Sequence, residues 1–210
     1  MAGTCPTDRD LGDVTSSTVV VGHTGELTRT LATELDAVTV APGGELPADI
    51  TRVVIVVDPC PRPVDVAALS GDDWHRLVDV SMWRTLTALQ QARAGFSVGG
   101  RIVVVVPTIG MAGALGLVAY TTAVEGIRAM VKSAARQWSS QGVGANLVAT
   151  PLSLFSDDAA AAGHLTVPAV ADESTLMHTV AESVKFLLRP DLDHLAGETI
   201  VADGGSVMLP

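Results

Sequence analysis

Runs of β-branched residues separated by amphipathic stretches are the feature that most limits how this 210-residue chain can fold. Strands that are buried on both faces of a parallel sheet have this composition, because helices cover both faces of such a sheet. The runs therefore predict a parallel sheet between two layers of helices. The expected strands are residues 17–22, 37–41, 51–58, 101–107, 145–150 and 198–203.

Stretches with helical periodicity fill the intervals between these runs. Apolar side chains recur at three- and four-residue spacing in residues 26–35, 73–92, 119–138 and 174–190. Alternation of strands and helices predicts a doubly wound α/β sheet. No repeat or linker divides the pattern, so we predict a single domain over residues 17–210. The polar residues 1–16 are expected to form a flexible N-terminal extension.

Charge and composition argue against several classes of function. The formal net charge of −10 argues against a sequence-independent nucleic-acid binder and against charge-driven docking on anionic membranes. No apolar run approaches the ~20 residues that cross a bilayer, so no membrane partner is expected. Cys5 and Cys60 make no disulfide framework, which favours a reduced, cytoplasmic setting. The histidines are scattered, so we expect no metal site.

Five short motifs occur in an order that resembles the short-chain dehydrogenase/reductase family. They are DWHRLVDVSMW (73–83), RIVVVVPTIGMAGALGLVAY (101–120), AYTTAVEGIRAMVKSAARQW (119–138), ANLVATP (145–151) and LAGETIVADGGSVM (195–208). The chain is similar to 3-oxoacyl-acyl-carrier-protein-reductase-like members of that family. The resemblance implies a Rossmann-like fold and an ancestry among nicotinamide-dependent oxidoreductases.

The same resemblance implies that most of the catalytic machinery is lost. Family members use a tyrosine as proton donor, a lysine that lowers the tyrosine's pKa, a serine and an asparagine. Here Tyr120 is retained as the candidate catalytic residue, but Val124, Pro107 and Ser81 stand at the lysine, serine and asparagine positions. An unassisted tyrosine has a pKa near ~10, so about one phenol in a thousand is ionised at neutral pH.

The segments that would hold a dinucleotide have also changed. In the turn after the first strand, Gly22 and Gly25 remain, but Leu27 and Thr28 stand where the family has its third glycine. A short loop, residues 41–49, replaces the family's third strand and adenine pocket. The family's Asn-Asn-Ala-Gly motif reads DPCP at residues 58–61, and the prolines remove backbone N–H donors. We therefore expect no NAD(P) cofactor.

Three functions are compatible with these changes. The first is a non-catalytic subunit that pairs through residues 73–92 and 119–138 with an active relative or with itself; Trp83 and Met130 suggest that these helices have an apolar outer face. The second is a cofactor-independent dehydratase, cyclase or isomerase with Tyr120 as proton donor. The third is an NAD(P)-dependent oxidoreductase completed by a partner subunit.

Three further side chains are candidates at the ends of the predicted strands. His23 follows the first strand, and it is either a base beside the crevice or a solvated loop residue. Asp58 and Cys60 lie at the carboxyl end of another strand, where doubly wound sheets bind ligands. An acidic strand end is also common without any function, and Cys60 has no evident activating neighbour in the sequence.

Overall fold

Six parallel strands form the centre of the protein in a computed structural model that describes residues 17–155, 168–170 and 172–207. The predicted extension, residues 1–16, lies outside the described residues. All six predicted strands are present, and the sheet order is β2-β1-β3-β4-β5-β6. The strands are β1 (Ser17–Val21), β2 (Val38–Val40), β3 (Ile50–Val56), β4 (Gly100–Pro107), β5 (Val143–Thr150) and β6 (Thr199–Val201).

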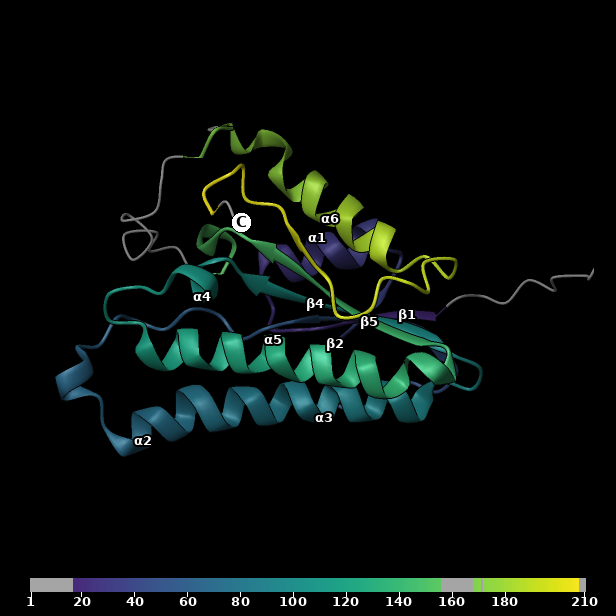
Figure 1. Cartoon of the computed structure of the whole chain (residues 1–210), viewed down its shortest axis with the longest axis horizontal. Helices are drawn as coiled ribbons and strands as arrows, with labels where there is room; N and C mark the ends of the chain where they lie inside the picture. The colour runs from purple at the N-terminus through teal and green to yellow at the C-terminus, as the bar shows by residue number, and fades with distance from the viewer. Residues whose placement is uncertain (1–16, 156–167, 171, 208–210) are drawn as a thin grey trace, which may run out of the picture.

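Helices cover both faces of the sheet, which confirms the doubly wound α/β prediction. In Figure 1, α3 and α5 lie on one face, while α1 and α6 lie on the other. The helices are α1 (Glu26–Glu34), α2 (Gly71–Trp74), which continues through a π-helical turn (His75–Asp79) into α3 (Val80–Gly95), α4 (Ile109–Ala112), α5 (Val118–Trp138) and α6 (Leu176–Leu187). Single 3-10 turns are Val66–Ala68, Ser139–Gln141, Leu152–Leu154 and Glu173–Thr175.

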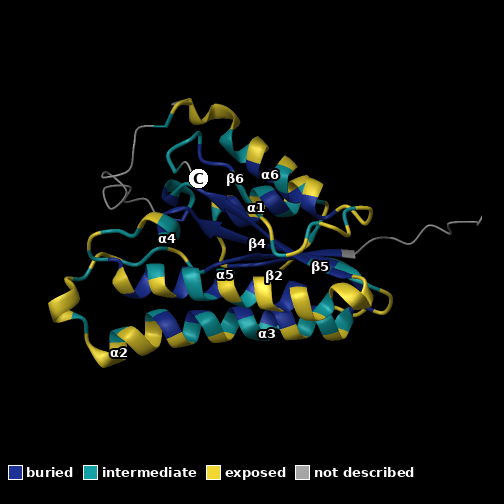
Figure 2. Cartoon of the chain, viewed as in Figure 1, coloured by how far each residue is buried: buried dark blue, intermediate teal, exposed yellow. Residues whose placement is uncertain are grey.

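The sheet is shorter than the family pattern at one edge. Residues 41–49 contain no strand and connect β2 directly to β3, as predicted from the sequence. Strand β2 therefore ends the sheet, and Val38 is 59% exposed on it. The core lies under the longer strands, whose central residues are fully buried, as the dark blue sheet in Figure 2 shows.

Helices α3 and α5 pack closely against each other on their shared face of the sheet. The side chain of Met82 lies over Gly126, where a Cβ atom would come within 2.8 Å of the Met82 methyl group. Val78, Ala119 and Ala123 form a small buried cluster at the N-terminal end of this contact. The side of these two helices that points away from the sheet is their outer face, and Figure 2 shows the helices as a mixture of exposed, intermediate and buried residues.

The two residues expected on that outer face behave differently. Trp83 is 65% exposed on α3, as its position outside the buried stripe suggested. Met130 is only partly buried but packs against the main hydrophobic core, so its assignment to the outer face was wrong. A long, unbranched side chain such as methionine can reach back to the core from the edge of a helix.

Candidate active site

Tyr120 lies inside the protein rather than at an open crevice. Its side chain is 4% exposed, and its hydroxyl donates a hydrogen bond to the backbone carbonyl of Asp58 at 3.0 Å. Burial, followed by the nearby charges of Cys60 and Asp58, raises the pKa of the Tyr120 phenol well above 10. The phenol is therefore uncharged, and its O–H group already donates a hydrogen bond to the protein backbone.

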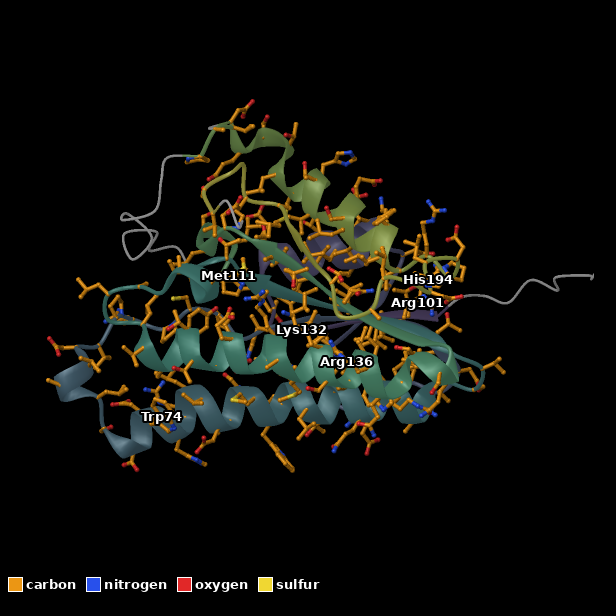
Figure 3. The ribbon with its side chains drawn as sticks, viewed as in Figure 1. Trp74, Arg101, Met111, Lys132, Arg136 and His194 are labelled. Atoms are coloured by element: carbon orange, nitrogen blue, oxygen red, sulfur yellow. The ribbon has the colours of Figure 1, made fainter. Side chains whose placement is uncertain are left out.

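The family's lysine position is filled by a packed apolar side chain. Val124 is 1% exposed, and one of its methyl groups lies 2.6 Å from the point where Gly110 would carry a Cβ atom. Arg128 pairs instead with Glu125 at 2.6 Å. Lys132 lies on the exposed side of α5, with its backbone and side chain against Gly197 (Figure 3). Neither cation is placed to assist the phenol.

The sequence did not predict that Asp58 binds side chains from the turn after β1 and from α3. One carboxylate oxygen lies 2.9 Å from His23 Nε2. The other accepts hydrogen bonds from the Ser81 hydroxyl at 2.5 Å and from Arg84 Nη1 at 3.2 Å. Arg84 was missed entirely, although its position three residues after Ser81 on the same helix places both on one face.

A pocket of about 260 Å³ opens beside this cluster, at the carboxyl ends of β1 and β3. Because β2 and β3 flank β1 on opposite sides, this is the point where the strand order reverses and where doubly wound sheets bind ligands. His23, Glu26 and Ser153 supply polar groups, and Leu154, Phe155 and Met177 are among the apolar lining residues. Tyr120 does not line it.

The residues at this crevice do not fit the dinucleotide that the fold family implies. The backbone N–H of Cys60 donates to the carbonyl of Phe155 at 3.0 Å, so the segments after β3 and β5 bind each other directly. Glu26 places a carboxylate in the first turn of α1, and no lysine or arginine lines the described pocket. A doubly negative pyrophosphate would meet repulsion there without a compensating cation.

The space beside the first glycine turn is also filled by a side chain. A Cβ atom at Gly22 would lie 2.9 Å from the Thr28 hydroxyl oxygen, so the Thr28 side chain occupies the space beside this turn. With the third strand gone, β2 is the edge of the sheet and provides no wall for an adenine ring. No step of a reaction is therefore assigned to a nicotinamide in this chain.

Other kinds of site are absent within the parts of the chain that the structure covers. No group of three or more histidine, cysteine or acidic residues is arranged to hold a metal ion there. None of the helices in the same residues is long and apolar enough to cross a membrane.

Replacing Tyr120 with phenylalanine tests whether the phenol is a packed, neutral side chain. We expect the Tyr120→Phe chain to fold with a free energy of unfolding lower by about 1 kcal/mol, because the partly buried Asp58 carbonyl loses its donor. The wild-type protein should also lose stability above about pH 10, since its folded-state pKa lies above the unfolded value. Below that pH the contribution of Tyr120 is fully present.

The pH effect is measured by denaturant unfolding of both chains between pH 8 and 11, and the advantage of the wild type should shrink only at the alkaline end. Because Tyr120 is the single tyrosine, phenolate absorbance reports its ionisation directly. A phenol that titrates at or below its ordinary value in the folded protein would contradict this assignment.

Known proteins share the sequence features of this fold. The family model described as Enoyl-(Acyl carrier protein) reductase matches residues 56–207. The chain is 28% identical over 156 residues to the 3-oxoacyl-(acyl-carrier-protein) reductase of Vibrio harveyi, a match that covers 67% of this chain and 60% of the relative. The corresponding reductase of Salmonella typhimurium is also 28% identical, with the same coverage.

A mouse protein gives a similar match. The chain is 28% identical over 156 residues to the (3R)-3-hydroxyacyl-CoA dehydrogenase of Mus musculus. This match covers 67% of this chain and 57% of the mouse protein. The chain thus matches about 60% of the length of the bacterial reductases.

Proposed function

The chain belongs to the short-chain dehydrogenase/reductase family, and we propose that within it this protein is a non-catalytic subunit that pairs with an active ketoreductase relative. Its contribution is structural: it supplies the outer face of α3 and α5 as a docking surface that stabilises the partner. A protein that binds only the folded partner raises the partner's stability by mass action, whatever the state of its own active site.

The observation that carries the proposal is the state of Tyr120. A proton donor for a substrate must reach that substrate, but this phenol is buried and donates to the Asp58 carbonyl. Its pKa is raised, whereas the family's chemistry depends on a cation that lowers it. Together with the direct hydrogen bond between Cys60 and Phe155, this argues against hydride transfer by this chain.

The outer face of α3 supports the second half of the proposal. Trp83 exposes 65% of its surface in the first turn of α3, and Trp74, the last residue of α2, is 38% exposed. Large aromatic side chains that are exposed in one chain are frequent anchors of protein–protein interfaces. Helix α5, which packs beside α3, exposes mainly small and polar side chains on its outer side, such as Thr122, Ala129 and Ser133.

Exchange of one exposed aromatic residue tests the proposal. We expect the purified native complex to contain a family member that carries the complete Tyr-x-x-x-Lys motif. In a binding assay between the two purified chains, Trp83→Glu should weaken association by about 2 kcal/mol or more, a factor of ~30, because the anchor is lost and a charge is buried.

Phe186→Glu is the matched control, because Phe186 is a 41%-exposed aromatic on α6, on the opposite face of the sheet. The Phe186→Glu chain should bind the partner with the same affinity as the wild-type chain. A chain that is monomeric in its native source, or a partner bound equally well by the Trp83→Glu and wild-type chains, would rule out docking through α3 and α5. Tight NADPH binding by the isolated chain would remove the argument that it is non-catalytic.

A further inference from the structure

The pair of His23 and Asp58 has the geometry of an acid–base site. His23 Nε2 lies 2.9 Å from Asp58, and among the described residues this carboxylate is the only hydrogen-bond partner of the imidazole. If Nε2–H donates to the carboxylate, the second ring nitrogen, Nδ1, keeps its lone pair and can accept a proton. A carboxylate in this position orients the ring and stabilises the imidazolium that forms.

The carboxylate itself is held in place by two further groups. Ser81 is buried and donates to Asp58 at 2.5 Å, while Arg84 contacts the same carboxylate oxygen at 3.2 Å. These contacts fix the oxygen that does not face His23. The carboxylate is therefore preorganised to bind the imidazole rather than free to rotate.

His23 is also one of the exposed polar residues that line the pocket. Its side chain is 44% exposed and forms part of the pocket wall, so a bound molecule can contact the ring. The hydroxyl oxygen of Ser153, another lining residue, is buried and has no hydrogen-bond partner within the part of the chain that the structure describes. A buried hydroxyl without a partner is costly, and a ligand with a polar oxygen would satisfy it.

We propose that this pocket binds a small uncharged carbonyl compound and that His23, oriented by Asp58, transfers a proton to and from it. The apolar side chains of Leu154, Phe155 and Met177 favour an uncharged ligand. The Glu26 carboxylate and the absence of lysine and arginine from the described lining disfavour an anion. This assignment does not require the subunit role, because none of the pocket-lining residues lies on α3 or α5. Ser81 and Arg84, which hold Asp58, are the residues of α3 that the site uses.

The proton transfer balances without any cofactor. His23 Nδ1 removes a proton from the carbon beside the carbonyl group, and the C–H electron pair forms a carbon–carbon double bond. The carbonyl π electrons move to the oxygen, to which the Ser153 hydroxyl donates a hydrogen bond. Return of the same proton to another atom of the enol system gives an isomer of the ligand, so no oxidant, reductant or leaving group is required.

The probe for this site is 5-nitrobenzisoxazole, a small uncharged molecule that reports on a base in an apolar pocket. A base removes its ring C–H proton, the electron pair forms a nitrile, and the N–O bond breaks to give 2-cyano-4-nitrophenolate, which is followed by absorbance. We expect the wild-type chain to catalyse this reaction and the His23→Gln chain to be slower by about 10²-fold, as for other positioned general bases.

Two further variants separate a pocket site from a histidine that merely reacts at the surface. His75 lies 3.0 Å from Asp79 but is 71% exposed on the helical surface and does not line the pocket, so His75→Gln should keep the wild-type rate. Leu154→Trp places a larger side chain in the pocket wall while keeping His23 and Asp58, and it should lower the rate by a similar factor to His23→Gln. Circular dichroism confirms that each variant is folded.

The proposal is overturned by a wild-type rate no higher than that of His23→Gln, or by equal losses in His23→Gln and His75→Gln. It is also overturned if filling the pocket with Leu154→Trp leaves the rate unchanged, since the base would then act outside the pocket. Association with a reductase partner is not measured by any of these rates, so failure here leaves the docking experiment to be judged on its own result.

Discussion

Replacing Arg101 with methionine is expected to lower the free energy of unfolding by about 4 kcal/mol. Arg101 is 7% exposed at the start of β4, and Figure 3 places it beside the loop that carries His194. Its guanidinium ties the start of the sheet to the chain segment after α6. It donates to the carbonyls of Gly100, Gly142, Arg189 and Pro190 and to the carboxylate of Asp193.

The size of this effect comes from the groups that remain after the exchange. Methionine fills much of the same volume, so the loss is not chiefly a cavity. It leaves up to three carbonyl oxygens without a donor, since the Gly142 carbonyl also accepts from the backbone N–H of Gly100. Each buried polar group that loses its partner costs about 1–3 kcal/mol. The exposed neighbours Arg189 and Pro190 can recover part of this by binding water, which keeps the expected total below the sum.

Asp193→Asn is the control for the charge on the other side of the contact. Asp193 is 73% exposed, so its ion pair with Arg101 is screened by water and should contribute no more than ~1 kcal/mol. Both variants are compared by urea unfolding with wild type. Equal destabilisation by the two exchanges would show that the ion pair, rather than the carbonyl cluster, holds this end of the sheet.

The fold was predictable because its signals are local. Each buried strand is a continuous run such as residues 101–107, and no other common element has that composition. The absence of the third strand could be predicted from the length of the connection, because residues 41–49 are too few to form a helix and a strand. The outer face of α3 was predictable in the same way, since Trp83 lies outside its buried stripe.

At the candidate site, the sequence predicted only which of the family's catalytic residues are missing. The changes at Val124 and Pro107 are read directly from the motif, whereas the contacts that replaced them join residues far apart in the chain. His23 and Asp58 are 35 positions apart, and no periodicity relates them. Cys60 and Phe155 meet only after β3, β4 and β5 have assembled in order. Such pairings depend on the register of the whole sheet.

Met130 shows the limit of reading a helical face from spacing alone. Its position placed it beyond the apolar stripe of α5, yet its side chain packs against the main core. Residues at the border of a stripe are assigned by the direction and length of the side chain, which depend on the neighbouring element. Trp83, by contrast, stays 65% exposed.

Restoring the family's lysine should not restore the family's activity. In Val124→Lys, an ammonium group enters a position that is 1% exposed and packed against Gly110. Burial of an unpaired charge is strongly unfavourable, so we expect the free energy of unfolding at pH 7 to fall by about 3 kcal/mol. Val124→Met is the matched control, because it adds a side chain of similar length without charge.

The pH dependence separates charge from size in this comparison. Burial lowers the pKa of a lysine in the folded state below its unfolded value of ~10.4, so the unfolded state binds more protons between these two values. Stability of Val124→Lys relative to Val124→Met should therefore rise with pH over that interval, and the full penalty should remain below the folded-state pKa. Unfolding both chains in urea from pH 7 to 10 gives this difference.

Activity is the decisive readout of the same variant. A lysine at position 124 leaves the hydrogen bond between Cys60 and Phe155, the Glu26 carboxylate and the missing third strand as they are. We therefore expect no NADPH binding by fluorescence titration and no oxidation of NADPH with a 3-oxoacyl substrate. If this one exchange produced both, the crevice would have to open readily, and the buried state of Tyr120 would be one of two conformations rather than the reason for lost chemistry.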